Sequence, residues 1–115
     1  MDKLKVGDRA PAFVLANQAG DMIALKNFKG DFNVVVYFYP RAMTLGCTVQ
    51  ACGIRDSQRE FLKLKTKVLA ISPDEVKRLV KFTDRDELNF DLLADVGHGV
   101  ADAYGVWGKK KFMGK

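Results

Sequence analysis

Residues that build metal centres and disulfide networks are scarce in this sequence. Its 115 residues contain two cysteines and one histidine, whereas structural zinc usually takes four ligands from cysteine, histidine or carboxylate. His98 lies far from both cysteines in the chain. A catalytic cysteine–histidine pair, as in cysteine hydrolases, has no supporting motif here, so His98 is interpreted as a surface or loop residue. We expect no metal site and neither a metal nor an organic cofactor.

Long hydrophobic runs are absent as well. No apolar stretch approaches the roughly 20 residues that a membrane-spanning helix needs. The segment from Met1 to Lys5 lacks the apolar core of a secretory signal. These observations predict a cytoplasmic protein without a membrane partner. Stable disulfides are uncommon in the cytoplasm, so two cysteines there indicate catalysis, redox sensing or metal binding.

The charge pattern gives little indication of a nucleic-acid partner. The net charge is +5, and the lysines are spread along the chain apart from the run Lys109-Lys110-Lys111. Such a run is compatible with a nucleic-acid or anion patch, but a solvated tail is the more common explanation. The chain has neither an aromatic ladder nor zinc-finger spacing. We expect no nucleic-acid partner.

What the chain does have is the composition of a folded α/β protein. Its length and its 48% hydrophobic content predict a single globular domain over residues 1–115. Strands are expected at about 13–15, 22–25, 33–39, 67–71 and 90–93, with the second pairing back on the first as a hairpin, and helices at about 46–64, 72–88 and 99–104. This alternation predicts a largely parallel sheet.

Three local patterns refine the prediction. The strand at 33–39 is apolar without polar alternation, which is typical of a strand covered on both faces. Ser72, Pro73 and Glu75 predict a helix start with a capping box, and Gly105 is expected just after a helix end. The apolar faces of the first two helices are assigned to Cys47, Ala51, Ile54, Phe61 and Leu62, and to Val76, Leu79, Val80 and Phe82.

Cys47 is the centre of the functional prediction. It follows the strand at 33–39 and Pro40, and therefore lies at the start of the next helix. Unpaired N–H groups and the helix dipole favour negative charge there, and the thiolate is the reactive form of cysteine. A free cysteine is often only a small buried apolar residue, but this position favours redox or nucleophilic chemistry.

The spacing of Cys47 and Cys52 constrains that chemistry. On an ideal helix, residues five apart have Cα atoms roughly 8–9 Å apart and point about 140° apart. A disulfide needs Cα atoms within about 7 Å. The two cysteines therefore cannot bond until the first turns of the helix unwind. This favours a cycle in which Cys47 reacts first and Cys52 later, over the preformed dithiol of a C-x-x-C oxidoreductase.

The same residues resemble a known family. Pro40, Thr44 and Cys47 match the peroxiredoxin motif P-x-x-x-T-x-x-C, and YPRAMTLGCTVQACGIRD, residues 39–56, closely resembles the bacterioferritin comigratory protein or peroxiredoxin Q subfamily. Further matches are Val6-Gly7-Asp8, Ala10-Pro11, Phe13, Leu93-Ala94-Asp95 and Tyr104-Gly105-Val106-Trp107-Gly108. The resemblance covers essentially the whole chain.

The resemblance implies a thioredoxin-like fold and a thioredoxin-dependent antioxidant peroxidase. Cys47 would be the peroxidatic cysteine, which reduces hydrogen peroxide or organic hydroperoxides and becomes a sulfenic acid. Cys52 would be the resolving cysteine, forming a redox-active disulfide with Cys47 that thioredoxin or a similar dithiol reduces. Thr44 would hold the thiolate or the peroxide through its hydroxyl, and Pro40 would shield the pocket from water. For Thr44 and Pro40 the structural alternatives are an N-cap and a strand terminator.

The chain also departs from the family pattern. Leu45 replaces a common proline, and Gln50 stands where many peroxiredoxins have glutamate. Family members continue past residue 115 with two strands and a helix, and one of these strands carries the arginine that pairs with the peroxidatic thiolate. Arg41 and Arg55 are near Cys47 only in sequence. We therefore expect a C-terminally truncated domain with an apolar sheet edge beside the strand at 33–39.

Two consequences and two alternatives follow from the departures. The family is expected to be monomeric, but the open edge offers a route to self-association, and the loss of the arginine is expected to weaken peroxidase activity. The first alternative is a catalytically weak remnant that acts as a redox-sensing or interaction protein. The second, a thiol–disulfide oxidoreductase, is disfavoured by the cysteine spacing.

Overall fold

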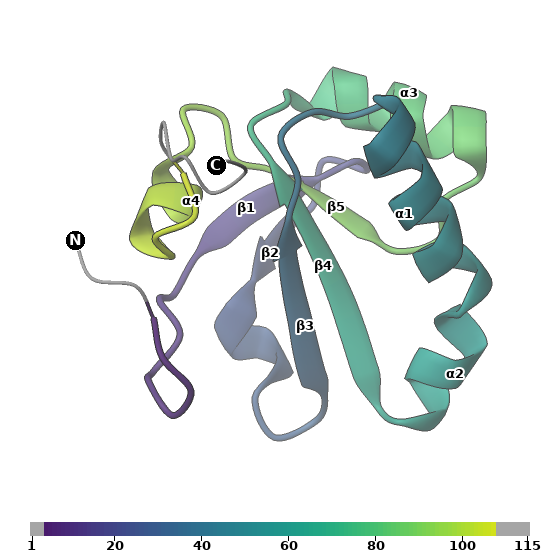
Figure 1. Cartoon of the computed structure of the whole chain (residues 1–115). Coiled ribbons are helices and arrows are strands. Elements are labelled where there is room, and N and C mark those ends of the chain that lie inside the picture. The colour runs from purple at the N-terminus through teal and green to yellow at the C-terminus, as the bar shows by residue number, and fades with distance from the viewer. Residues whose placement is uncertain (1–3, 108–115) are drawn as a thin grey trace.

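The computed structural model describes residues 4–107, which build a five-stranded sheet in the order β2-β1-β5-β4-β3 (Figure 1). The strands are β1 (Val14–Asn17), β2 (Met22–Ala24), β3 (Asn33–Phe38), β4 (Thr66–Ser72) and β5 (Asp91–Ala94). The helices are the 3₁₀ helix η1 (Leu25–Phe28), α1 (Leu45–Asp56), α2 (Gln58–Lys63), α3 (Val76–Asp86) and α4 (Gly99–Ala103). The lysine run 109–111 lies outside the described residues.

The sheet is mixed rather than largely parallel. β3, β4 and β5 are parallel to one another, as the alternation of strands and helices predicts. β1 is antiparallel to both β2 and β5. The hairpin of β1 and β2 was predicted, and Gly20 turns it with a φ of 85°, a value that glycine adopts without steric cost.

The most buried strand is β4, not β3. Leu69, Ala70 and Ile71 of β4 are fully buried, because β4 has a strand on each side and helices on both faces. β3 is the edge strand among the described residues, and Val35 in its middle is 44% exposed. The prediction that β3 is covered on both faces is confirmed in part: Val34, Val36 and Phe38 pack against one apolar cluster and Tyr37 against the other, whereas Val35 is exposed. The open edge expected beside β3 is present among the described residues.

Two apolar clusters lie on opposite faces of the sheet. One lies under α1, α2 and α3 and is built around Val68, Ala70 and Leu92. The other lies on the α4 side and is built around Leu69, Ile71 and Leu93. Alternate residues of each buried strand point to opposite faces, so β4 contributes to both clusters. Figure 1 shows α4 on one side of the sheet and α1, α2 and α3 on the other.

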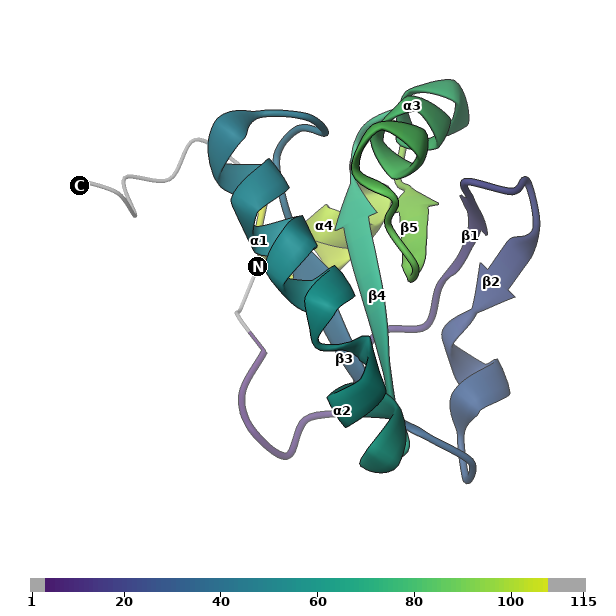
Figure 2. The ribbon, with the colours of Figure 1, turned by 90° about the vertical axis from the view of Figure 1, so that its right-hand side faces the viewer.

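The predicted helix at 46–64 is two helices. It breaks at Ser57, where α1 ends and α2 begins, and the two helices follow one another along β3 and β4 (Figure 2). Cys47, Ala51, Ile54 and Phe61 face the core as predicted, whereas Leu62 is 54% exposed. The break at Ser57 changes the orientation of α2 relative to α1, so one helical wheel cannot place the side chains of both helices.

The predicted capping box is wrong. Ser72 is the last residue of β4, and α3 begins at Val76 after Glu75, which occupies the N-cap without a side-chain cap bond. The hydroxyl of Ser72 instead donates to Asp74 Oδ2 at 2.9 Å. The stripe on α3 is partly as predicted, because Leu79 and Phe82 are buried while Val80 is exposed.

α4 is held by a buried carboxylate. Asp95, next to the end of β5, accepts hydrogen bonds from the backbone N–H groups of Val100 at 3.0 Å and Ala101 at 2.9 Å. Gly105 follows the helix with a φ of 73°, as expected for its position. Within residues 4–107, no helix combines the length and the apolar character that crossing a membrane requires.

Candidate active site

Cys47 lies in the first turn of α1, at the end of the sheet where β3 terminates. Thr44 occupies the N-cap, and the helical hydrogen bond from Thr48 N to Thr44 O measures 2.8 Å. The N–H groups of Leu45, Gly46 and Cys47 precede that bond and so have no acceptor within the helix. The thiol of Cys47 is free and half-buried. This arrangement places a reduced sulfur beside the positive end of a helix dipole.

The loop between β3 and α1 has an unusual backbone. Met43, directly before the N-cap, adopts the left-handed conformation with a φ of 67°, which costs a non-glycine residue free energy. The Thr44 hydroxyl donates to the carbonyl of Arg41 at 3.3 Å. Thr44 is thus an N-cap by position, while its side chain closes the loop rather than capping the helix.

Two tyrosines of β3 and its extension share the core cluster with Cys47. The rings of Tyr37 and Tyr39 are 5.9 Å apart between centroids, and both pack in the cluster that Cys47 contacts. Burial, and secondly the negative charge of Cys47, raise the pKa of Tyr37 to about 12. Burial also raises the pKa of Tyr39. Both phenols, which are neutral at pH 7 even at the ordinary tyrosine pKa of about 10, therefore stay neutral to a higher pH in this cluster.

Cys52 lies on the same helix and is also free and half-buried. Arg55 follows it by one turn, and its Nε donates to Asp56 at 2.9 Å. The hydrogen bond to Asp56, with a smaller contribution from the charge of Cys52, raises the pKa of Arg55. Because both cysteines lie on one continuous helix, the geometric constraint expected from their spacing applies to the folded structure.

Comparison with known proteins gives the family. Residues 6–115 match the AhpC/TSA family. The chain is 51% identical to peroxiredoxin Bcp of Escherichia coli over 115 residues, which is all of this chain and 73% of that protein. The chain belongs to the AhpC/TSA family. It is a peroxiredoxin of the Bcp type, a thiol peroxidase, as its sequence predicts.

Solved structures agree with this assignment. The crystal structure of the peroxidoxin BcpB from Mycobacterium tuberculosis superposes with a TM-score of 0.88 at 36% identity, over 93% of this chain and 70% of that one. A structure of the Xanthomonas campestris bacterioferritin comigratory protein, studied for its alkyl peroxide reduction, gives a TM-score of 0.81 at 28% identity. The match covers 90% of this chain and 65% of that one. The predicted thioredoxin-like peroxiredoxin fold is confirmed.

In this peroxiredoxin, the loop before Cys47 is clamped to the end of the neighbouring strand. Ala42 is fully buried, and its backbone N–H donates to Asp74 Oδ2 at 2.7 Å. Its carbonyl accepts from Arg78 Nη2 at 3.2 Å, and Arg78 Nε lies 3.2 Å from Asp74 Oδ1. A carboxylate and a guanidinium therefore fix the backbone N–H and the carbonyl of one residue in the loop before Cys47.

Sequence reasoning missed this clamp. The local pattern predicts a helix start at Ser72, whereas in the structure the Ser72 hydroxyl orients the Asp74 carboxylate that holds Ala42. The position of Asp74 directly after a predicted strand could have indicated the clamp. In a parallel sheet, residues that follow one strand lie at the same end of the sheet as the loop that follows the adjacent strand.

Pro40 is exposed and lines a hollow of about 670 Å³ at the same end of the sheet. The hollow extends from β3 and β4 to Val106 and Trp107, and its lining includes the β3 residues Val36 to Phe38. Its walls are mainly apolar side chains. Three of the predicted site residues lie close together in the chain at this end of the sheet. Pro40 lies near the start of the loop between β3 and α1, Thr44 ends it, and Cys47 lies in the first turn of α1.

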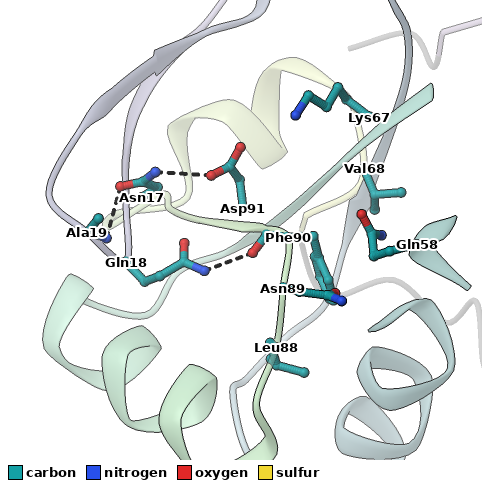
Figure 3. A pocket seen from close by; sticks show the side chains of 10 residues that line it. All are labelled: Asn17, Gln18, Ala19, Gln58, Lys67, Val68, Leu88, Asn89, Phe90 and Asp91. Atoms are coloured by element: carbon teal, nitrogen blue, oxygen red, sulfur yellow. Dashed lines mark hydrogen bonds between the residues drawn. The ribbon is translucent and has the colours of Figure 1, made fainter. Parts of the chain in front are cut away.

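A second, polar hollow of about 350 Å³ lies at the other end of β5 (Figure 3). There Asn17 Nδ2 donates to Asp91 Oδ1 at 3.0 Å. Gln18 donates to the carbonyl of Phe90 at 2.8 Å and accepts from the N–H of Leu92 at 2.9 Å. These bonds tie the β1–β2 hairpin to β5. β5 runs parallel to β3, so its first residues lie away from the loop that carries Cys47.

Proposed function

We propose that Cys47 is the peroxidatic cysteine of this peroxiredoxin. Its thiolate attacks one oxygen of a hydroperoxide, the O–O bond breaks, and the second oxygen leaves as water or an alcohol after taking up a proton. Cys47 becomes a sulfenic acid. The observation that supports this role most strongly is the placement of a free, half-buried thiol in the first turn of α1.

Cys52 is the resolving cysteine in this proposal. Its thiol condenses with the sulfenic acid, the new S–S bond replaces the S–OH bond, and the hydroxyl leaves as water with the thiol proton. A dithiol reductant such as thioredoxin then reduces the disulfide and restores both thiols. The position of both cysteines on α1 supports a separate, later step, since that helix must open first.

Thr44 and Pro40 have supporting roles. Thr44 begins the helix that carries Cys47, and its hydroxyl lies in the loop where a peroxide would approach. Pro40 lines the apolar hollow beside β3, whose lining includes neither Thr44 nor Cys47. Its apolar walls suit the hydrocarbon part of an organic hydroperoxide, while hydrogen peroxide needs only access to Cys47. The Xanthomonas relative, which was studied for alkyl peroxide reduction, supports this substrate class.

We place the protein in the cytoplasm as a single domain that acts as a monomer. The edge strand β3, with Val35 exposed, is the surface on which copies would associate if they do so. The competing proposal is a redox sensor, in which Cys47 is oxidised once and turnover is slow.

One pair of substitutions tests the assignment. We expect Cys47→Ser to abolish peroxide consumption coupled to thioredoxin, and Cys52→Ser to form a stable sulfenic acid at Cys47 with no turnover. Peroxide loss and intact mass after thiol alkylation are the measurements. Unchanged peroxide consumption in Cys47→Ser would falsify the proposal. Sulfenic acid formation in the wild-type chain without multiple turnovers would favour the redox sensor.

A further inference from the structure

Helix α1 has to open between Cys47 and Cys52, yet few side chains bury it. Ala51 is its one fully buried residue, and Leu45 and Val49 are 83% and 65% exposed. Cys47 and Ile54 are only partly buried against the core cluster. Where burial is this limited, individual polar contacts to neighbouring elements have a large share in holding the helix.

Polar contacts with α3 and with the segments on either side of it hold the two ends of the region that contains the cysteines. Beyond Cys52, Arg55 Nη1 donates to the carbonyl of Asp86 at 2.6 Å, and Asn89 Nδ2 donates to the carbonyl of Arg55 at 3.3 Å. Before α1, the clamp on Ala42 fixes the loop. The stretch that must unwind therefore lies between two anchored ends.

One contact crosses the stretch itself. Arg85 Nη2 donates to Thr48 Oγ1 at 2.7 Å, and Thr48 lies between the two cysteines. The guanidinium of Arg85 is held for this contact by Asp86, whose Oδ2 accepts from Arg85 Nε at 2.9 Å. It also lies over the ring of Phe82, 5.8 Å from the centroid. Hydrogen bonds from a charged donor are stronger than neutral ones.

We infer that Arg85 is a positioning residue that latches α1 in its folded form through Thr48, and thereby sets the rate at which Cys52 can reach oxidised Cys47. The inference rests on the proposed roles of the two cysteines. The anchors at Ala42 and Arg55 limit the opening to the turns that contain Thr48. The Arg85–Thr48 bond must break in every opening event, whereas the two anchors can persist.

The latch also bears on the fate of the sulfenic acid. Cys47 sulfenic acid either condenses with Cys52 or is oxidised by a second peroxide to sulfinic acid, in which the sulfur has gained one more oxygen and the peroxide has been reduced to water or an alcohol. A helix that opens more slowly leaves the sulfenic acid exposed to this second oxidation for longer. Arg85 thus slows resolution and lengthens the time in which the sulfenic acid can be oxidised again, without a role in the first step.

The test compares paired variants. Thr48→Val removes the acceptor and keeps the branched shape, Thr48→Ser keeps the hydroxyl, and Arg85→Gln removes the donor charge. Lys81→Gln, at an exposed position one turn earlier on α3, removes the same charge and leaves the Arg85–Thr48 bond in place. Exchange of the amide hydrogens of Gln50, Ala51 and Cys52 in the fully reduced protein reports opening of α1.

We expect Thr48→Val and Arg85→Gln to accelerate this exchange about 2- to 5-fold, the lower part of the range for one lost hydrogen bond, because the Arg85–Thr48 contact is exposed to solvent. After rapid mixing with one equivalent of hydrogen peroxide, both variants should form the Cys47–Cys52 disulfide faster by a similar factor, with sulfenic acid formation unchanged. The double variant should match the single variants, because both remove the same contact. Thr48→Ser and Lys81→Gln should behave as wild type.

Two results would separate the possible failures. Exchange rates in Thr48→Val and Arg85→Gln equal to those of Lys81→Gln would overturn the latch, whatever the chemistry of Cys47. If the wild-type chain forms no disulfide with peroxide, the proposed function fails. Amide exchange in the reduced protein then still decides whether Arg85 holds α1.

Discussion

Helices α1 and α3 cover the same face of the sheet but are attached to it in different ways. α3 buries Leu79 and Phe82 almost completely, whereas α1 buries only Ala51 to that extent. α3 also supplies the polar groups that hold α1 and its preceding loop, through Arg78 and Arg85. The comparison indicates that α3 is a fixed platform and that α1, which carries both cysteines, is held on it by contacts that can break singly.

The largest effect on stability should follow from a substitution that removes the packing of α3 against the sheet. Leu79 is fully buried in the cluster between α3 and the sheet, so Leu79→Ala removes apolar contacts and leaves a cavity. We expect a loss of about 2–5 kcal/mol in the free energy of unfolding, measured by urea denaturation of the reduced protein. Val80→Ala on the exposed side of the same helix is the control. A loss below that of the control would show that α3 is not the platform.

An intermediate effect is expected at the clamp. Asp74→Ala leaves the buried N–H of Ala42 without its acceptor, which should lower the free energy of unfolding by about 1–3 kcal/mol. It should also slow sulfenic acid formation at Cys47, because the loop that sets Thr44 and Cys47 loses its fixed point. Urea denaturation and rapid-quench alkylation measure the two quantities.

Glu75→Ala is the matched control for Asp74→Ala. Glu75 is exposed and lies 3.8 Å from Lys77 in a surface ion pair, a kind of contact that contributes little to stability. If Asp74→Ala and Glu75→Ala gave the same unfolding free energy and the same sulfenic acid rate, the clamp would have no role in the site.

The sequence was informative about local structure and about the position of Cys47. The apolar runs predicted β4 and β5 within a few residues, and the strand followed by Pro40 predicted that Cys47 begins a helix. These features depend on neighbours in the chain. The buried position of β4 depends on which strands pair, and an apolar run carries no information about that. The edge position of β3 is expected only from the family resemblance, not from the apolar pattern of the strand.

The contacts that organise the site were harder to predict for the same reason. Asp74 and Ala42 are 32 residues apart, and Arg85 and Thr48 are 37 apart. Local pattern places Asp74 within a predicted helix start, and nothing in the sequence around Arg85 singles that residue out. Asp74 and Arg85 make these contacts because α3 packs beside α1 and the loop between β3 and α1. The sequence patterns of α1 and α3 do not specify that packing.

The smallest effect should come from the exposed face of α1. Val49 lies between the two cysteines and is 65% exposed, so Val49→Ala loses little packing, while alanine has the higher helix propensity. We expect the free energy of unfolding to change by no more than about 0.5 kcal/mol, and the folded form of α1 to be favoured by a similar amount. Disulfide formation after one equivalent of peroxide should then slow by about 2-fold, a factor that corresponds to this energy.

Val80→Ala makes the same substitution on α3, outside the stretch that opens. Its rate of disulfide formation should equal that of the wild type, as measured by rapid-quench alkylation and intact mass. Faster disulfide formation in Val49→Ala than in Val80→Ala would mean that α1 does not have to unwind before Cys52 meets Cys47. The difference between the two helices would then concern stability alone, because the rate of resolution would be set by a motion that leaves α1 intact.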